Sequence, residues 1–167
     1  MTDAPKNTSA LTHLDVEGRP KMVDVSEKAA TARWATAEGS IRMSVSTLAK
    51  LIEGGPKGDA LRVAELSGIQ AAKRTSELIP LCHLLPAVSV GVEVTPDLDL
   101  PGLKAQAIAR VQGSTGVEME ALTAVSVALL TLYDMGKAID RGMIISDIRL
   151  TEKAGGRSGV WRASDLT

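Results

Sequence analysis

The stretch STGVEMEALTAVSVALLTLYDMGK, from Ser114 to Lys137, decides the fold of this chain. It predicts one long helix whose middle, Ala121 to Leu132, is almost wholly apolar or small. Because a surface helix of a soluble domain usually keeps one polar face, we expect this helix to be enclosed on nearly all sides. Its polar ends are therefore where chemistry is expected: Glu118 and Glu120 at the start, Asp134 and Lys137 at the end.

The composition limits the classes of function. A chain of 167 residues is one domain of ordinary size, and its net charge of −1 gives no general attraction to nucleic acid or to an anionic membrane. The absence of Phe, with one Tyr and two Trp, leaves little surface on which bases could stack. The single cysteine, Cys82, excludes an internal disulfide and fits a reducing cytoplasm. We expect no signal peptide at the start and no apolar segment long enough to cross a membrane.

Hydrophobic periodicity and turn signals predict the order β-α-α-β-β-α-β. The strands are expected at 33–43, 88–94, 103–111 and 142–150, with a turn over 95–102. Helices are expected at 46–53, capped by Ser44 or Ser46, and at 59–77, capped by Asp59. The fold class is therefore α+β, an antiparallel sheet with helices on one face. Residues 1–21 are predicted to be a flexible arm, 22–161 a single domain and 162–167 a tail.

Basic side chains gather around a break in the second helix. Lys73 and Arg74 precede Pro80, and His83 follows it. Loop amides and cations at such a break can hold a phosphate group. The alternative is a solvated Lys-Arg pair stabilised by the dipole of the helix. A metal site is not expected, because adjacent residues such as Cys82 and His83 rarely bind the same ion.

The acids at the start of the long helix allow two interpretations. Glu118 and Glu120 are two positions apart and point to different sides, so they cannot act together on one atom. Either both complement the helix dipole, or one accepts hydrogen bonds from a guanidinium-like edge of a ligand. Gly113 and Gly116 would let such a ligand approach the backbone.

The acid–base pair at the end of the helix is also open to two interpretations. Asp134 and Lys137, at i and i+3, can form an ordinary solvated ion pair. Beside a buried cleft, the lysine could instead serve as a general acid or base. The 14 positions between Glu120 and Asp134 correspond to about 21 Å of helix. Since a small substrate cannot bridge that length, we expect a neighbouring subunit to complete the site.

Two basic segments contain glycines, namely residues 55–59 and 153–159. Neither matches a Walker loop, and each alone is typical of an ordinary surface loop. Together with the other cations, in a chain of net charge −1, they indicate a small polyanionic ligand rather than DNA.

Several strings in the chain resemble the molybdenum cofactor biosynthesis protein C family, the cyclic pyranopterin monophosphate synthases. They are MVDVSEKAATAR, KGD, GIQAAKRTSELIPLCH, TGVEMEALTAVSVALLTLYDMGKA and KAGGRSG, and the resemblance as a whole extends from about Leu11 to Trp161. The resemblance implies a ferredoxin-like subunit in a homohexamer, a trimer of dimers, with active sites between subunits. It implies that a radical S-adenosylmethionine enzyme supplies a cyclised dihydro-GTP, which this family converts to cyclic pyranopterin monophosphate with release of pyrophosphate.

The resemblance also implies roles for particular residues. Asp134 is the expected active-site acid, and Lys137 and Lys57 are the expected acid–base or phosphate-binding lysines. The expected substrate-binding residues are Leu81, Cys82, His83, Glu118, Met119, Glu120, Lys73, Arg74 and Lys153. No cofactor is expected, although Mg²⁺ could accompany the triphosphate. The chain departs from the family at LCHLL, where LCHPL is usual, and at DMGK, where DMCK is usual.

Two other classes of protein share these features of the sequence. A regulatory module could bind a nucleotide without converting it, and a structural subunit would do neither. Release of pyrophosphate from the cyclised dihydro-GTP distinguishes the enzyme from both.

Overall fold

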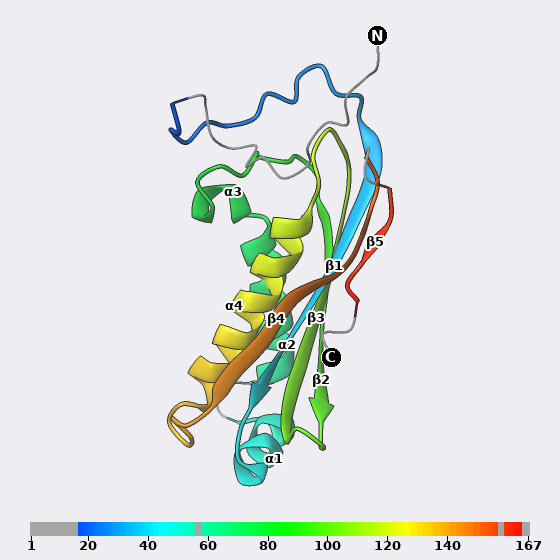
Figure 1. Ribbon diagram of the computed structural model, residues 1–167. Helices are drawn as coiled ribbons and strands as arrows, with labels where there is room; N and C mark the ends of the chain where they lie inside the picture. Colours follow the sequence, from blue (N-terminus) through cyan, green and yellow to red (C-terminus); the bar gives the residue numbers. More distant parts are fainter. Residues whose placement is uncertain (1–16, 56–57, 157–158, 165–167) are drawn as a thin grey trace.

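The computed structural model describes residues 17–55, 58–156 and 159–164, which form one antiparallel sheet covered on one face by helices (Figure 1). Residues 1–16 of the predicted flexible arm, 1–21, lie outside the described residues. Along the chain the elements are β1 (Thr31–Arg42), α1 (Val45–Glu53), α2 (Ala60–Ala72), α3 (Thr75–Leu78), β2 (Ser89–Asp97), β3 (Gly102–Gly113), α4 (Glu118–Gly136), β4 (Ile144–Ala154) and β5 (Trp161–Arg162).

The strand order is β2-β3-β1-β4-β5, with every neighbouring pair antiparallel. Strand β1 lies in the centre and pairs with β3, which is equally long, along its full length, from Thr31 opposite Gly113 to Arg42 opposite Gly102. Helices α2 and α4 pack beside each other on the same face. The prediction of an α+β, ferredoxin-like fold is therefore confirmed, with β5 as an additional edge strand.

Small residues let the helices lie close to the sheet and to each other. The inward positions of β1 and β3 are mostly alanines, and Ala35, Ala37 and Ala105 have no exposed surface. On α2, a Cβ at Gly68 would lie only 2.7 Å from the backbone oxygen of Ala124 on α4. The low aromatic content of the chain thus corresponds to a thin, closely packed core rather than to an empty one.

Several element boundaries differ from the prediction. The helix expected over 59–77 divides at Lys73, because the Thr75 side chain is buried and its hydroxyl donates to the Ala72 carbonyl at 2.9 Å. The long helix begins at Glu118 rather than at Ser114, and β4 continues to Ala154. Both predicted caps exist: Ser44 caps α1, and Asp59 caps α2.

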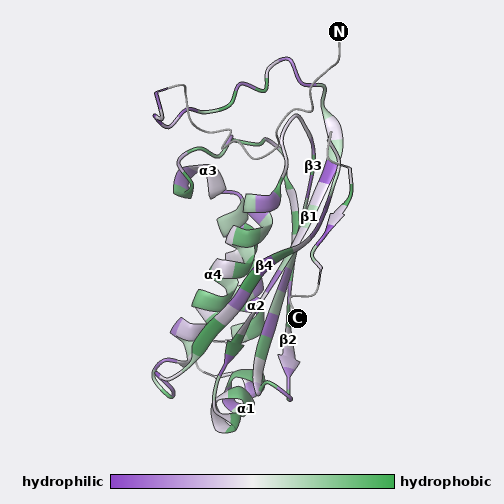
Figure 2. Cartoon of the chain, in the orientation of Figure 1, coloured by the Kyte–Doolittle hydropathy of each residue, from purple (hydrophilic) through white to green (hydrophobic). Residues whose placement is uncertain are grey.

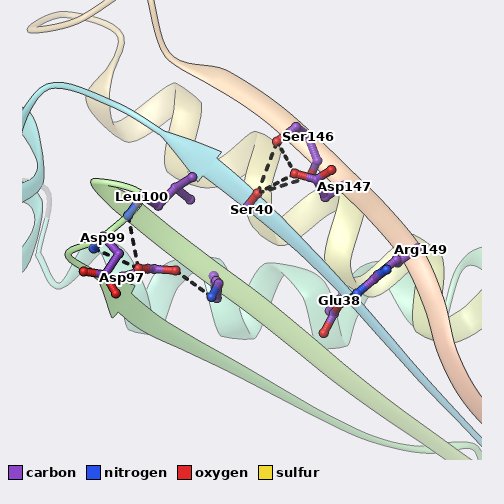
Figure 3. A network of polar contacts seen from close by, with 9 residues as sticks. Glu38, Ser40, Asp97, Asp99, Leu100, Ser146, Asp147 and Arg149 are labelled. Atoms are coloured by element: carbon purple, nitrogen blue, oxygen red, sulfur yellow. Dashed lines mark hydrogen bonds and ion pairs between the residues drawn. The ribbon is translucent and has the colours of Figure 1, made fainter. Parts of the chain in front are cut away.

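The open face of the sheet carries a network of polar side chains (Figure 3). Glu38 and Ser40 point to this face between buried neighbours on β1. Glu38 pairs with Arg149 at 2.8 Å, and the Ser40 hydroxyl lies 3.4 Å from the Asp147 carboxylate. Asp147 has a φ of 57° at a bulge in β4 opposite Gly39. These contacts tie β4 to β1 on the side away from the helices.

The expectation that α4 is enclosed on nearly all sides is wrong for the isolated chain. Its middle is strongly hydrophobic (Figure 2), yet Leu130 is 59% exposed and Met119 is 36% exposed. Contrary to expectation, α4 is also long and apolar enough, at 19 residues and a mean hydropathy of 1.2, to cross a membrane by length and composition. Half of the 18-residue segment that has this mean hydropathy is buried inside the protein. Because the core helix of a soluble protein meets the same criteria, this is weak evidence for a membrane span.

Candidate functional site

A cavity of about 510 Å³ lies at the start of α4. The connector after α3 forms one wall of the cavity and the first turn of α4 forms another. Six residues that were expected to bind substrate line this cavity: Leu81, Cys82, His83, Glu118, Met119 and Glu120. The structure therefore joins the two segments that the sequence placed 38 positions apart, from Cys82 to Glu120.

Glu120 is the residue of this cavity with the most unusual environment. It is only 3% exposed, and its Oε1 accepts a hydrogen bond from the Cys82 thiol at 3.8 Å. Its Oε2 is buried and has no hydrogen-bond partner among the described residues. Burial raises the pKa of the Glu120 carboxyl, because the charged form loses its hydration. This oxygen therefore lacks the hydrogen bond that a buried polar atom usually has.

The connector holds its two polar side chains in defined states. Burial, followed by the negative charge of Glu120, raises the pKa of the Cys82 thiol to about 11. The thiol is therefore protonated at neutral pH and acts as a donor to Glu120. The His83 Nε2 lies 2.8 Å from the Val23 carbonyl, which can only accept, so Nε2 carries a proton.

Two of the predicted phosphate-binding cations lie near this end of α4. Lys153 on β4 donates to the Glu118 carboxylate at 2.9 Å, with both side chains about 30% exposed. Lys73 lines a smaller cavity of about 210 Å³ that shares His83 and Glu120 with the first. Arg74 is the N-cap residue of α3 and lines neither cavity.

Residues of the segment before β1 close the cavity and were not assigned to it from the sequence. They are Val23, Val25 and Lys28. Lys28 adds a cation at the rim. Its only signal in the sequence was its place in the string MVDVSEKAATAR, since no periodicity connects that string to α4.

Asp134 and Lys137 lie at the opposite end of α4 and form the expected ion pair. Their side chains are 59% and 55% exposed, so within a single chain the pair is the solvated ion pair of the first interpretation and does not lie in a buried cleft. The neighbouring residues Met135, Ala138 and Ile139 line a separate cavity of about 370 Å³.

A glycine turn forms the other wall of that third cavity. Gly55 and Gly58 both line it, and the Gly58 N–H donates to the Gly55 carbonyl at 2.8 Å. The remaining predicted lysine, Lys57, lies outside the described residues. The chemistry-bearing residues thus form two groups at opposite ends of α4, near α3 and near α1 (Figure 1). In the described ranges, no three His, Cys, Asp or Glu side chains gather as metal ligands.

Comparison with known proteins assigns the chain to a family. Residues 22–156 match the model of the MoaC family. The chain is 58% identical over 156 residues to a protein of Brucella ovis and to one of Brucella melitensis, each named cyclic pyranopterin monophosphate synthase. A Brucella canis protein of the same name is 57% identical, and in all three cases 93% of this chain and 94% of the relative are covered. The chain therefore belongs to the MoaC family.

Proposed function

We propose that this chain is a cyclic pyranopterin monophosphate synthase, a lyase of molybdenum cofactor biosynthesis that acts on a GTP-derived substrate. The proposal depends on one observation above all, the buried and unpaired oxygen of Glu120 under the LCH connector in a chain 58% identical to synthases. The finer reaction is conversion of (8S)-3′,8-cyclo-7,8-dihydroguanosine 5′-triphosphate to cyclic pyranopterin monophosphate and pyrophosphate.

The cavity at the start of α4 is the proposed binding half of the site. A guanine-derived ring presents adjacent N–H donors, and Glu120 Oε2 supplies an acceptor that none of the described residues uses. Lys73 and Lys153 border the binding region and would attract the triphosphate, with Arg74 and Lys57 as further cations. Cations placed there would also stabilise the negative charge that develops on departing pyrophosphate.

The ion pair at the end of α4 is the proposed proton-transfer half. Solvent weakens the interactions of an exposed ion pair, so Asp134 and Lys137 would act on a substrate more effectively where water is excluded. A covering surface is therefore part of the proposal.

A second copy of the chain is the proposed cover, within the homohexamer that the resemblance implies. The outer stripe of α4 has the small, half-buried Ser126 and the exposed, large Leu130 near its middle. If two α4 helices packed antiparallel, Leu130 of one chain would lie on Ser126 of the other, which suits ridge-into-groove packing. The same arrangement would bring Lys137 of one chain beside Met119 of the other, so that each site would draw residues from two chains.

Further parts of the proposal concern the surroundings of the enzyme. We place the protein in the cytoplasm, downstream of a radical S-adenosylmethionine enzyme that supplies the substrate. We propose no resident cofactor, with Mg²⁺ entering only as a companion of the triphosphate. Nucleic acid and membranes are not proposed as partners.

Pyrophosphate release from the purified protein and the cyclised dihydro-GTP is the direct test. Asp134→Ala and Lys137→Ala should leave the assembly folded and abolish product formation. No release by the wild-type protein with verified substrate would refute the enzymatic proposal, and saturable binding would then favour the regulatory module.

Mixing of two inactive variants tests whether two chains share a site. Glu120→Gln and Lys137→Ala damage opposite ends of α4. If each site uses both ends from different chains, unfolding and refolding the two variants together should restore about a quarter of wild-type activity, since half the dimers are mixed and each has one intact site. No recovery beyond that of the separate variants would refute the shared site.

A further inference from the structure

Asp140, three positions after Lys137, connects α4 to an element that begins almost 100 residues earlier. The Ile139 and Asp140 N–H groups both donate to the Gly136 carbonyl, at 2.9 and 3.0 Å, so the turn carrying Asp140 continues rigidly from α4. The Asp140 carboxylate accepts from the Ser44 N–H at 3.0 Å and from the Gly142 N–H at 2.9 Å.

The contacts of Asp140 are with the first turn of α1. Ser44 is the N-cap of α1, and its hydroxyl accepts from the Thr47 N–H at 3.2 Å. Thr47 is completely buried, and its hydroxyl lies 3.4 Å from Asp140 Oδ2. A carboxylate at a helix start is favoured by the unpaired N–H groups and by the dipole. These hydrogen bonds lower the pKa of the Asp140 carboxyl, which is therefore ionised throughout the neutral range.

The other end of α1 forms a wall of the third cavity. Its last turn and the glycine turn that follows lie opposite the end of α4 around the space of about 370 Å³. In the last turn of α1, Leu51 is buried, and its side chain would lie 3.5 Å from a Cβ added at Gly136. Helix α1 is thus held to α4 at two places: by the Asp140 carboxylate at its start and by Leu51 at its end.

We infer that Asp140 is a positioning residue that sets where α1 and the glycine turn lie relative to Asp134 and Lys137. This inference rests on the proposed function of that pair. Asp140 holds the cavity wall and is not itself placed against the substrate. Its loss should therefore misplace the proton-transfer half while leaving the binding cavity at the far end of α4 unchanged.

Asp140→Asn tests the inference, with Asp97→Asn as a matched control. Asp97 also accepts two backbone N–H groups, from Asp99 at 3.0 Å and Leu100 at 3.2 Å. Its pKa is lowered as well, chiefly by the Lys104 ammonium 2.6 Å away, but Asp97 is the last residue of β2 and does not line the third cavity. In steady-state pyrophosphate release, Asp140→Asn should lower kcat about tenfold and change KM less than about twofold, since small misplacements of reacting groups are costly. Asp140→Glu, which keeps the carboxylate, should recover part of kcat. Equal effects of the Asp140 and Asp97 variants on kcat would overturn the inference.

A distance measurement tests the positioning without depending on activity. Spin labels at Lys50→Cys on α1 and Ile139→Cys after α4 lie on opposite walls of the cavity, in a Cys82→Ser background that removes the only native cysteine. With the labelled chain diluted into unlabelled protein, Asp140→Asn should shift or broaden the distance distribution and Asp97→Asn should not. An unchanged distribution would overturn the inference even if the wild-type protein were active. A wild-type protein without activity would instead refute the proposed function and leave this measurement decisive for Asp140.

Discussion

Glu120→Gln should make the protein more stable at neutral and alkaline pH. In the wild-type chain, the Glu120 carboxyl is 3% exposed and has one unpaired oxygen, and burial raises its pKa. The folded state therefore binds the proton more tightly than the unfolded state does. It follows that the contribution of Glu120 to stability is most favourable below the unfolded pKa and is lost as the pH rises through the folded pKa.

The structure sets the size of the effect. Leaving a buried acceptor unpaired costs about 1–3 kcal/mol, with charged groups at the upper end. Glutamine has nearly the same shape, keeps an oxygen for the Cys82 thiol and carries no charge, although its NH₂ group also lacks a partner. The net gain in the free energy of unfolding should therefore be on the order of 1 kcal/mol at pH 8. Near pH 4, where the wild-type carboxyl is protonated, the gain should disappear.

Urea unfolding followed by circular dichroism at several pH values between 4 and 8 measures this difference. Glu77→Gln is a suitable control, because Glu77 is exposed on α3 and its substitution should change stability by less than about 0.5 kcal/mol at every pH. A Glu120→Gln variant that is less stable than wild type at pH 8 would contradict the reasoning. So would a stability difference that is the same at both ends of the pH range. Loss of pyrophosphate release in the stabilised variant would identify Glu120 as a functional residue kept at a cost in stability.

Three further substitutions or modifications follow from local packing and charge. Gly68→Ala should destabilise the fold by about 1–3 kcal/mol in urea unfolding, because its Cβ would lie 2.7 Å from the Ala124 backbone oxygen, which cannot move aside like a side chain. Cys82, with a pKa of about 11, should react slowly with iodoacetamide at pH 7.5, and its rate should still be rising at pH 10 when followed by mass spectrometry. Gly136→Ala should change stability by less than about 1 kcal/mol, because the gain in helix propensity offsets a close contact with the flexible end of Met143, 2.9 Å away.

The sheet and its helices could be predicted because their signals are local. Alternation through Val90, Val92 and Val94 predicts β2, and the observed pairing of Val94 with Ala105 confirms the hairpin. The caps Ser44 and Asp59 were predictable for the same reason, since each bonds to N–H groups within three residues of itself. The division of the second helix was not predictable, because it depends on the burial of Thr75, which is a tertiary property.

The candidate site was predicted as residues but not as an arrangement. No periodicity in the sequence indicates that the Cys82 thiol lies against Glu120, or that Asp140 reaches back to Ser44. Both contacts join segments that are far apart in the sequence and that become neighbours only when the helices pack on the sheet. The sequence left the state of Asp134 open between a solvated ion pair and a pair beside a buried cleft, because the charge pattern at the end of a helix is the same in both cases.

The ambiguity at the two ends of α4 has a physical origin. Glu118 in the first turn and Lys137 at the C-cap have the charges that a helix dipole favours, so an ordinary stabilising role and a functional role predict the same residue types there. Burial separates the two roles. Glu118, about 30% exposed and paired with Lys153, needs no ligand to account for its charge, whereas Glu120 has a buried oxygen without a partner among the described residues. Dipole complementation does not require that burial, since a surface acid in the first turn would give the same benefit without the desolvation cost. Glu120 is therefore the acid of α4 whose placement dipole complementation alone does not explain, which agrees with the proposed binding role.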